Sequence, residues 1–193
     1  MPLTQEIQVS SDIVLKPHQT AYAEDLFKVI DRYRNDLAPF LHWVRFNRTP
    51  EDAQQFALAC ENHRRQKRAA VWIIEVDGSA AGTVSFHPDI DWHHKTAVLG
   101  YWLSPAYQGR GIACRSVAAL MDAFSHLLDT FVLKIASHNK ASTALAERLG
   151  FVWLRRDTAA ELIGNMRYDQ NIYRKTLGPP PHRTAAANTN QAV

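Results

Sequence analysis

The order of apolar and polar positions along the chain predicts a series of strands and amphipathic helices. The clearest strand runs from Thr96 to Leu103, where β-branched and aromatic residues are frequent. Ser104-Pro105 ends this strand, because proline lacks the N–H group that a β-ladder needs. A long helix follows, since the next apolar residues are spaced three and four apart and form one buried stripe. They are Ile112, Ala113, Val117, Leu120, Met121, Phe124, Leu127 and Leu128.

The same two periodicities predict further strands and helices. Strands are expected over residues 13–15, 71–76, 80–86, 131–136, 151–156 and 169–177, and helices over residues 20–35, 49–67 and 142–149. Thr49 is expected to cap its helix, with Phe56 facing inward, and Asp77-Gly78 is a strong hairpin signal. We expect residues 40–46 to form a loop anchored by buried rings, and residues 157–168 to connect the last two strands.

This element order predicts an α/β fold in which helices flank a central mixed, mostly antiparallel sheet. The chain has 193 residues, of which 46% are hydrophobic and 21% are charged, as expected for one globular domain with a full core. We expect this domain to span residues 11–177. Residues 1–12 would form an extended lead-in, and residues 178–193 a disordered tail rich in Pro, Ala, Asn and Thr.

Composition narrows the classes of function that fit the chain. The net charge of +3 and the pI near 9.0 favour anionic ligands slightly, but are too small to predict nucleic-acid binding. No apolar run approaches the length of a membrane span and no signal segment is present, so we expect a cytoplasmic protein. Neither Cys60 and Cys114 nor the adjacent His93 and His94 have metal-ligand spacing, so no metal is predicted.

A glycine-rich turn lies between the strand at 96–103 and the long helix. Its residues are Gln108, Gly109, Arg110, Gly111, Ile112 and Ala113. The start of a helix offers unpaired backbone N–H groups and partial positive charge, glycines allow close approach, and Arg110 adds a full charge. The turn therefore predicts a pyrophosphate site. The dinucleotide-binding fingerprint fits less well, because Ala113 follows the two glycines and the next strand lacks the required acid.

The turn resembles the Gln/Arg-x-x-Gly-x-Gly/Ala motif of the GNAT superfamily of N-acetyltransferases. Gln108, Gly111 and Ala113 occupy the three defined positions of this motif. A second block, Asn139 to Ser142 and then Ala146 to Phe151, is similar to the Asn, short helix and Leu-Gly-Phe ending of the family. Two blocks in the right order, separated by a helix and a strand, are much more specific than one glycine turn.

Two further segments resemble the RimL/RimJ group of ribosomal-protein acetyltransferases within this superfamily. They are Gly100 to Leu103, just before the glycine turn, and the ending Tyr168 to Tyr173. The resemblance covers about residues 11–177. It implies an acetyl-CoA-dependent N-acetyltransferase whose acceptor is a primary amine on a protein N-terminus, a small molecule or an aminoacyl nucleotide. It also implies a homodimer.

The resemblance assigns roles to residues near the turn. The pyrophosphate of acetyl-CoA would lie on Gln108 to Ala113, and the pantetheine arm would pair with a splayed strand around Trp102 and Leu103. Asn139 is expected to bind the same arm, and its alternative is a turn-forming role. Trp43 is expected mainly as a ring that anchors a loop, and the resemblance makes it a secondary candidate for the acceptor wall.

Acetyl transfer needs a base for the amine proton and a proton for the departing thiolate. The resemblance implies Glu161 as the base, between the last two strands; the alternative is an ordinary exposed glutamate, and Asp157 and Glu75 are weaker candidates. Many GNAT enzymes place a tyrosine as the proton donor at the position that is Ala146 here. We therefore expect Ser142 to donate to the sulfur, and its alternative is a serine that caps the helix.

Two other functions stay open. The absence of the tyrosine favours a non-catalytic module that binds coenzyme A or another pyrophosphate nucleotide. An RNA- or ribosome-associated protein would use the basic run Arg64, Arg65, Lys67 and Arg68. Such a run at the end of a helix is more often a solvated surface that complements the helix dipole.

Overall fold

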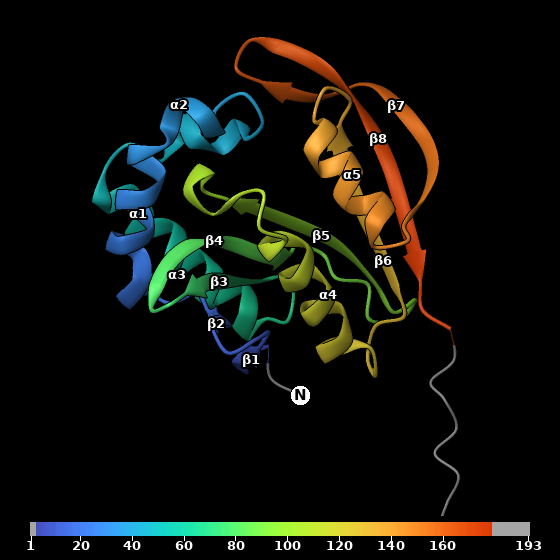
Figure 1. Cartoon of the computed structure of the whole chain (residues 1–193), viewed down its shortest axis with the longest axis horizontal. Coiled ribbons are helices and arrows are strands. Elements are labelled where there is room, and N and C mark those ends of the chain that lie inside the picture. The colour runs from blue at the N-terminus through green and yellow to red at the C-terminus, as the bar shows by residue number, and fades with distance from the viewer. Residues whose placement is uncertain (1–2, 179–193) are drawn as a thin grey trace, which may run out of the picture.

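The computed structural model describes residues 3–178, which form one eight-stranded sheet covered by helices (Figure 1). The strands are β1 (Ile7–Gln8), β2 (Ile13–Pro17), β3 (Ala70–Val76), β4 (Ser79–Phe86), β5 (Thr96–Leu103), β6 (Thr130–Ala136), β7 (Val152–Ile163) and β8 (Met166–Thr176). Their order in the sheet is β1-β2-β3-β4-β5-β6-β8-β7. Neighbouring strands are antiparallel except for β5 and β6, which are parallel, so the predicted mixed and mostly antiparallel sheet is confirmed.

Helices and short 3-10 turns connect these strands. They are η1 (Thr20–Tyr22), α1 (Ala23–Arg32), α2 (Arg34–Leu37), η2 (His42–Phe46), α3 (Pro50–Arg65), η3 (Pro105–Tyr107), α4 (Ile112–Phe124) and α5 (Lys140–Arg148). The predicted start of α3 is confirmed, because the Thr49 hydroxyl accepts from the Asp52 backbone and the Asp52 carboxylate accepts in return. The helix predicted over residues 20–35 is interrupted at Tyr33, and α4 ends before Leu127 and Leu128.

Helices pack on both faces of the sheet because its inner strands are apolar on both sides. In β3, Trp72 and Ile74 belong to the larger core together with Phe124 of α4. Ile73, which points the opposite way, packs with Leu26 of α1 in a second core. α4 and the pair α1 and α3 therefore cover opposite faces (Figure 1).

The parallel pair β5 and β6 separates halfway along its length. The pairing runs from Thr96 opposite Thr130 to Leu99 opposite Leu133 and stops there. Beyond this point β5 continues to Leu103 beside β4, whereas β6 continues to Ala136 beside β8. The sheet therefore opens between the ends of β5 and β6. Within residues 3–178, β5 is paired past this point only with β4, and β6 only with β8.

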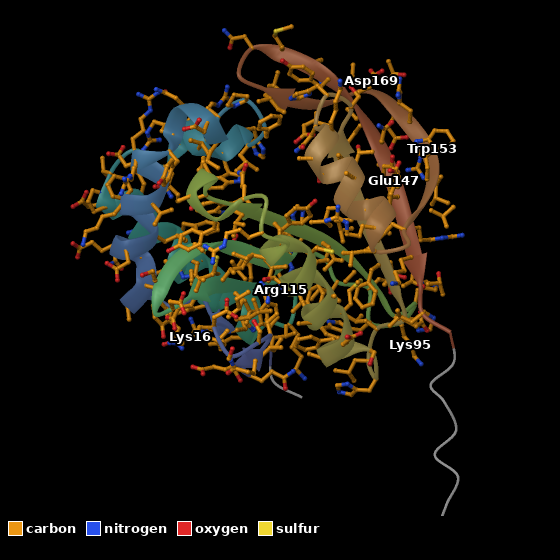
Figure 2. The ribbon with its side chains drawn as sticks, in the orientation of Figure 1. Lys16, Lys95, Arg115, Glu147, Trp153 and Asp169 are labelled. Atoms are coloured by element: carbon orange, nitrogen blue, oxygen red, sulfur yellow. The ribbon has the colours of Figure 1, made fainter. Side chains whose placement is uncertain are left out.

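The last two strands form a longer hairpin than the sequence predicts. Residues 157–168 do not form a connecting loop, because β7 runs to Ile163 and β8 begins at Met166. A bulge interrupts the pairing between Asp157 and Glu161, and Ala159 has a positive φ of 48°. Asp169 of β8 stabilises the bulge by accepting a hydrogen bond from the Ala159 N–H at 3.0 Å (Figure 2).

At the N-terminal side, the predicted lead-in takes part in the sheet and the core, and the Phe side chains that were expected to be buried are exposed. The lead-in contains β1, and Leu3 and Ile7 are buried in the larger core. Phe40 and Phe46 are 39% and 61% exposed, so these two rings are not buried, and η2 fully buries only Val44. The Trp43 ring is partly buried and packs against the second core. Phe56 on α3 is 47% exposed rather than facing inward, since small residues of α3 contact α1 instead.

The remaining expectations concern the C-terminal residues and membrane-spanning helices. The predicted disordered tail, residues 178–193, lies outside the described residues apart from Gly178. Within residues 3–178, no helix has both the length and the apolar composition required to cross a membrane.

Candidate active site

The glycine turn leads directly into α4, as predicted. Gly109 and Gly111 have positive φ values of 74° and 70°, and Gly111 is the N-cap of the helix. A side chain would be strained at either position, whereas glycine adopts this conformation freely. Apart from each glycine's own chain neighbours, no atom of residues 3–178 lies within 4 Å of the places where a Cβ atom would stand. The backbone of the turn is therefore open to a ligand.

The N–H groups of this turn are available to an anion. Within the described residues, no backbone or side-chain acceptor is recorded for the N–H groups of Gly109, Arg110, Gly111, Ile112 and Ala113. They lie at the N-terminus of a 13-residue helix, where the helix dipole favours negative charge, and Arg110 is exposed beside them. This arrangement can hold a pyrophosphate.

Gln108 connects the turn to the open end of the sheet. Its side-chain amide donates a hydrogen bond to the Leu103 carbonyl at 2.9 Å. Trp102 and Leu103 pair with Thr83 and Gly82 of β4, and both lie beyond the point where β6 has left β5. The turn is thereby fixed close to the strand end that was expected to contact the pantetheine arm.

A cavity of about 490 Å³ lies at the opening between β5 and β6. Trp102, Asn139, Ser142 and Glu161 all line this cavity, although they come from β5, α5 and β7. Trp43 lines it as well and packs against Trp102, with ring centroids 5.9 Å apart. Leu103 and the turn from Gln108 to Ala113 lie outside the cavity lining. The structure thus brings the predicted catalytic residues together and keeps the pyrophosphate turn beside them.

Glu161 is a strand residue of β7 rather than part of a loop. The bulge at Ala159 shifts the register of β7, so Glu161 pairs with Tyr168. Its carboxylate accepts a hydrogen bond from the Gln170 side chain at 3.1 Å, which holds it at the cavity. The two weaker candidates are engaged elsewhere: Asp157 forms an ion pair with Arg155, and Glu75 one with Lys16. Neither of them lines the cavity.

Asn139 and Ser142 have different local roles. Asn139 is the N-cap of α5, and its side-chain oxygen accepts the Ser142 N–H at 3.1 Å. Ser142 is therefore not the capping residue, and this alternative is wrong. Its hydroxyl instead lies 2.6 Å from the Tyr101 hydroxyl. Ala146, where many family members have a tyrosine, is fully buried.

Sequence reasoning missed Tyr101 as a residue of the site. In the strand from Thr96 to Leu103 its ring is typical of a β-strand, and nothing in the pattern links it to a serine 41 positions later. Burial raises the pKa of Tyr101 to about 12, so its phenol stays protonated near pH 7.

The basic run at the end of α3 makes contacts within the chain. Arg64 donates to the His18 carbonyl at 2.8 Å, and Arg68 forms an ion pair with Asp89. Because two of its arginines are engaged within the chain, the basic run fits a solvated helix end better than an RNA-binding surface.

Within residues 3–178, no group of three or more metal-binding side chains is assembled.

Known proteins share both the sequence and the fold. The family model for the acetyltransferase (GNAT) domain matches residues 12–152. The ribosomal-protein-serine acetyltransferase of Escherichia coli (strain K12) is 27% identical over 177 residues, which cover 91% of this chain and 98% of that protein.

Two solved structures extend the comparison. The microcin C7 self-immunity acetyltransferase MccE, in complex with acetyl-CoA and AMP, is 32% identical with a TM-score of 0.84, covering 88% of this chain and 94% of that one. The ribosomal-protein acetyltransferase RimL, in complex with coenzyme A, is 26% identical with a TM-score of 0.87, covering 90% and 98%.

The chain therefore belongs to the GNAT acetyltransferase family, as its two sequence blocks indicated. Its reaction is acetyl-CoA-dependent transfer of an acetyl group to an amine.

Proposed function

We propose that the chain acetylates an α-amino group by direct attack of the amine on the thioester of acetyl-CoA. The domain proposed for this reaction is residues 11–177, to whose sheet β1 adds a further strand. One observation carries the proposal: Glu161 and Ser142 reach one cavity from β7 and α5, where β5 and β6 separate. A carboxylate and a hydroxyl at the same opening supply the two proton-transfer groups that the reaction needs.

The coenzyme occupies the α4 side of this opening. Its pyrophosphate lies on the free N–H groups of the glycine turn, and its pantetheine arm runs beside the free edge of β5 at Trp102 and Leu103. Backbone N–H groups of this edge stabilise the oxyanion that forms during attack. The side-chain oxygen of Asn139 caps α5, and its NH₂ group, which has no hydrogen-bond partner within residues 3–178, contacts the arm.

Proton transfer accompanies the formation and collapse of the tetrahedral intermediate. Glu161 accepts a proton from the attacking nitrogen, directly or through water. The carbon–sulfur bond then breaks with its electron pair on sulfur, and Ser142 donates its hydroxyl proton to that sulfur. The serine regains a proton from water, while Glu161 returns the amine proton to solvent.

The charges around the cavity favour an α-amine over a polyamine. Among the described residues that line it, Glu161 is the only carboxylate, and the lining also contains the cation Lys134. A polyamine would bring several positive charges with one carboxylate to balance them. An α-amine has a pKa of about 8, so a useful fraction is neutral near pH 7 and can attack.

An aminoacyl nucleotide is the second candidate acceptor, because it also carries an α-amine. AMP is present in the solved structure of MccE, which is 32% identical to this chain. Phe40 and Trp43 line the cavity and offer aromatic surface to such a ligand.

A panel of four compounds, one of them a peptide whose α-amine is blocked, tests the acceptor class by release of the coenzyme A thiol. It consists of a short peptide with N-terminal serine, the same peptide with a blocked N-terminus, spermidine, and a non-hydrolysable aminoacyl sulfamoyl adenosine. We expect turnover of the free peptide, none of the blocked one, and a kcat/KM for spermidine at least about tenfold lower.

Other outcomes of the panel change the conclusion. Turnover of the adenosine compound without the peptide would replace the first acceptor by the second, and turnover of spermidine alone would contradict the α-amine. Tight binding of acetyl-CoA with no turnover of any amine would favour the non-catalytic module.

The homodimer implied by the resemblance stays a proposal. β7 is one of the two edge strands of the sheet in residues 3–178 and exposes Val152, Leu154 and Trp153, the last labelled in Figure 2. An edge strand with adjacent apolar side chains is the surface on which a second copy would pair.

A further inference from the structure

Tyr101 and Ser142 form the shortest polar contact between the separated strand β5 and the helix α5. Their hydroxyl oxygens are 2.6 Å apart, and both residues line the cavity that also holds Glu161. Tyr101 lies two residues beyond Leu99, the last position at which β5 pairs with β6. The pair therefore stands at the opening where the thioester is proposed to react.

Both backbones of this pair are held rigidly. Tyr101 pairs with Val84 of β4, and the Ser142 N–H donates to the capping oxygen of Asn139. The hydroxyl groups consequently meet in a fixed geometry rather than on flexible loops. Within residues 3–178, neither hydroxyl has another recorded hydrogen-bond partner.

The chemistry of the two hydroxyls decides which one donates. A phenol O–H is more acidic than an aliphatic alcohol and is therefore the stronger hydrogen-bond donor of the two. Burial raises the pKa of Tyr101, which keeps that phenol protonated. When the phenol donates to the serine oxygen, the serine hydrogen is left free to point into the cavity. If the serine donated instead, its hydrogen would be directed away from the sulfur.

We propose that Tyr101 is a positioning residue that donates to Ser142 Oγ and thereby directs the serine hydrogen toward the sulfur of departing coenzyme A. The inference rests on the proposed role of Ser142. As the proton moves from Ser142 Oγ to sulfur, negative charge grows on the serine oxygen. The hydrogen bond from Tyr101 becomes charge-assisted and strengthens at that moment, until water returns a proton to the serine.

A double-mutant cycle tests this inference with Tyr101→Phe, Ser142→Ala and the double variant, at saturating acetyl-CoA and acceptor. We expect each single variant to lower kcat about tenfold and the double variant to lower it no further than the larger single effect. The KM for acetyl-CoA should stay within about twofold, because neither hydroxyl is proposed to bind the coenzyme. Tyr33→Phe, which removes a phenol hydroxyl at the end of α1, is the matched control and should keep the wild-type kcat.

The conservative variant Ser142→Thr tests whether Tyr101 orients the hydroxyl at residue 142 or only packs against it. It retains a hydroxyl, so we expect it to keep most of the rate when Tyr101 is present and to lose it when residue 101 is phenylalanine. A wild-type kcat for Tyr101→Phe, or multiplicative effects in the double variant, would overturn the inference while leaving Ser142 in place. A wild-type kcat for Ser142→Ala would instead remove the proposed function of Ser142 and this inference with it.

Discussion

The coenzyme side and the acceptor side of the site are assembled in different ways. On the coenzyme side, one continuous stretch from Thr96 to Phe124 supplies the strand end, the glycine turn and the helix that follows. On the acceptor side, the cavity wall collects residues from α1, η2, α3 and β7, which are far apart in the sequence. The coenzyme site therefore depends on the conformation of one segment, whereas the acceptor wall depends on how distant segments pack together.

This difference predicts that substitutions on the two sides affect different steps of the reaction. Variants of the glycine turn should change the affinity for acetyl-CoA and leave the chemistry intact. Variants of the β7 residue that lines the cavity, Glu161, should change the chemistry and leave coenzyme binding intact.

The largest expected effect is that of Glu161→Gln. The amide can still accept the hydrogen bond from Gln170, but it cannot take a proton, so kcat should fall about 10³-fold. Steady-state kinetics with the peptide acceptor measure this loss, and calorimetry should give an unchanged Kd for acetyl-CoA. Asp157→Asn, on the same strand but outside the cavity, is the matched control and should keep kcat within about twofold. Equal kinetics of the two variants would remove Glu161 as the base.

Acid should destabilise the packing behind the acceptor wall. His18 is 1% exposed, contacts the Phe56 ring of α3 and has a pKa that burial lowers from 6.5 to about 4. The unfolded chain therefore binds a proton between pH 6.5 and pH 4 that the folded chain does not. The free energy of unfolding is therefore highest above pH 6.5, and it falls by up to about 3 kcal/mol as the pH drops to 4.

Urea unfolding at pH 7.5 and pH 4.5 measures this dependence. His18→Gln, which cannot take up the proton, should flatten it by most of that amount. An unchanged slope in this variant would show that other groups cause the loss of stability in acid.

The sequence predicted the coenzyme side closely and the acceptor side only in part, for physical reasons. Gly109 and Gly111 signal their positive φ values by residue type alone, and the spacing of Ile112, Val117 and Leu120 reports one buried helix face. The bulge at Ala159 leaves no such signal, because two alanines break the alternation of the strand.

Long-range contacts explain what else sequence reasoning missed. Glu161 was identified through resemblance, but its place on a strand depends on pairing with β8. The contact between Tyr101 and Ser142 joins elements 41 residues apart, and the exposure of Phe56 depends on how α3 packs against α1. None of these contacts has a periodicity that a single sequence can display.

The affinity of Gly111→Ala for acetyl-CoA tests the central claim most directly. Gly150→Ala is its matched control, because Gly150 also has a positive φ, 73°, and open space at the Cβ position, but it follows the C-cap Leu149 of α5 instead of starting α4. Both variants should lose about 1 kcal/mol of stability from backbone strain. We expect only Gly111→Ala to raise the Kd for acetyl-CoA, by about tenfold, because its methyl group enters the space of the pyrophosphate. The same Kd for the two variants would contradict a pyrophosphate bound at the N-terminus of α4.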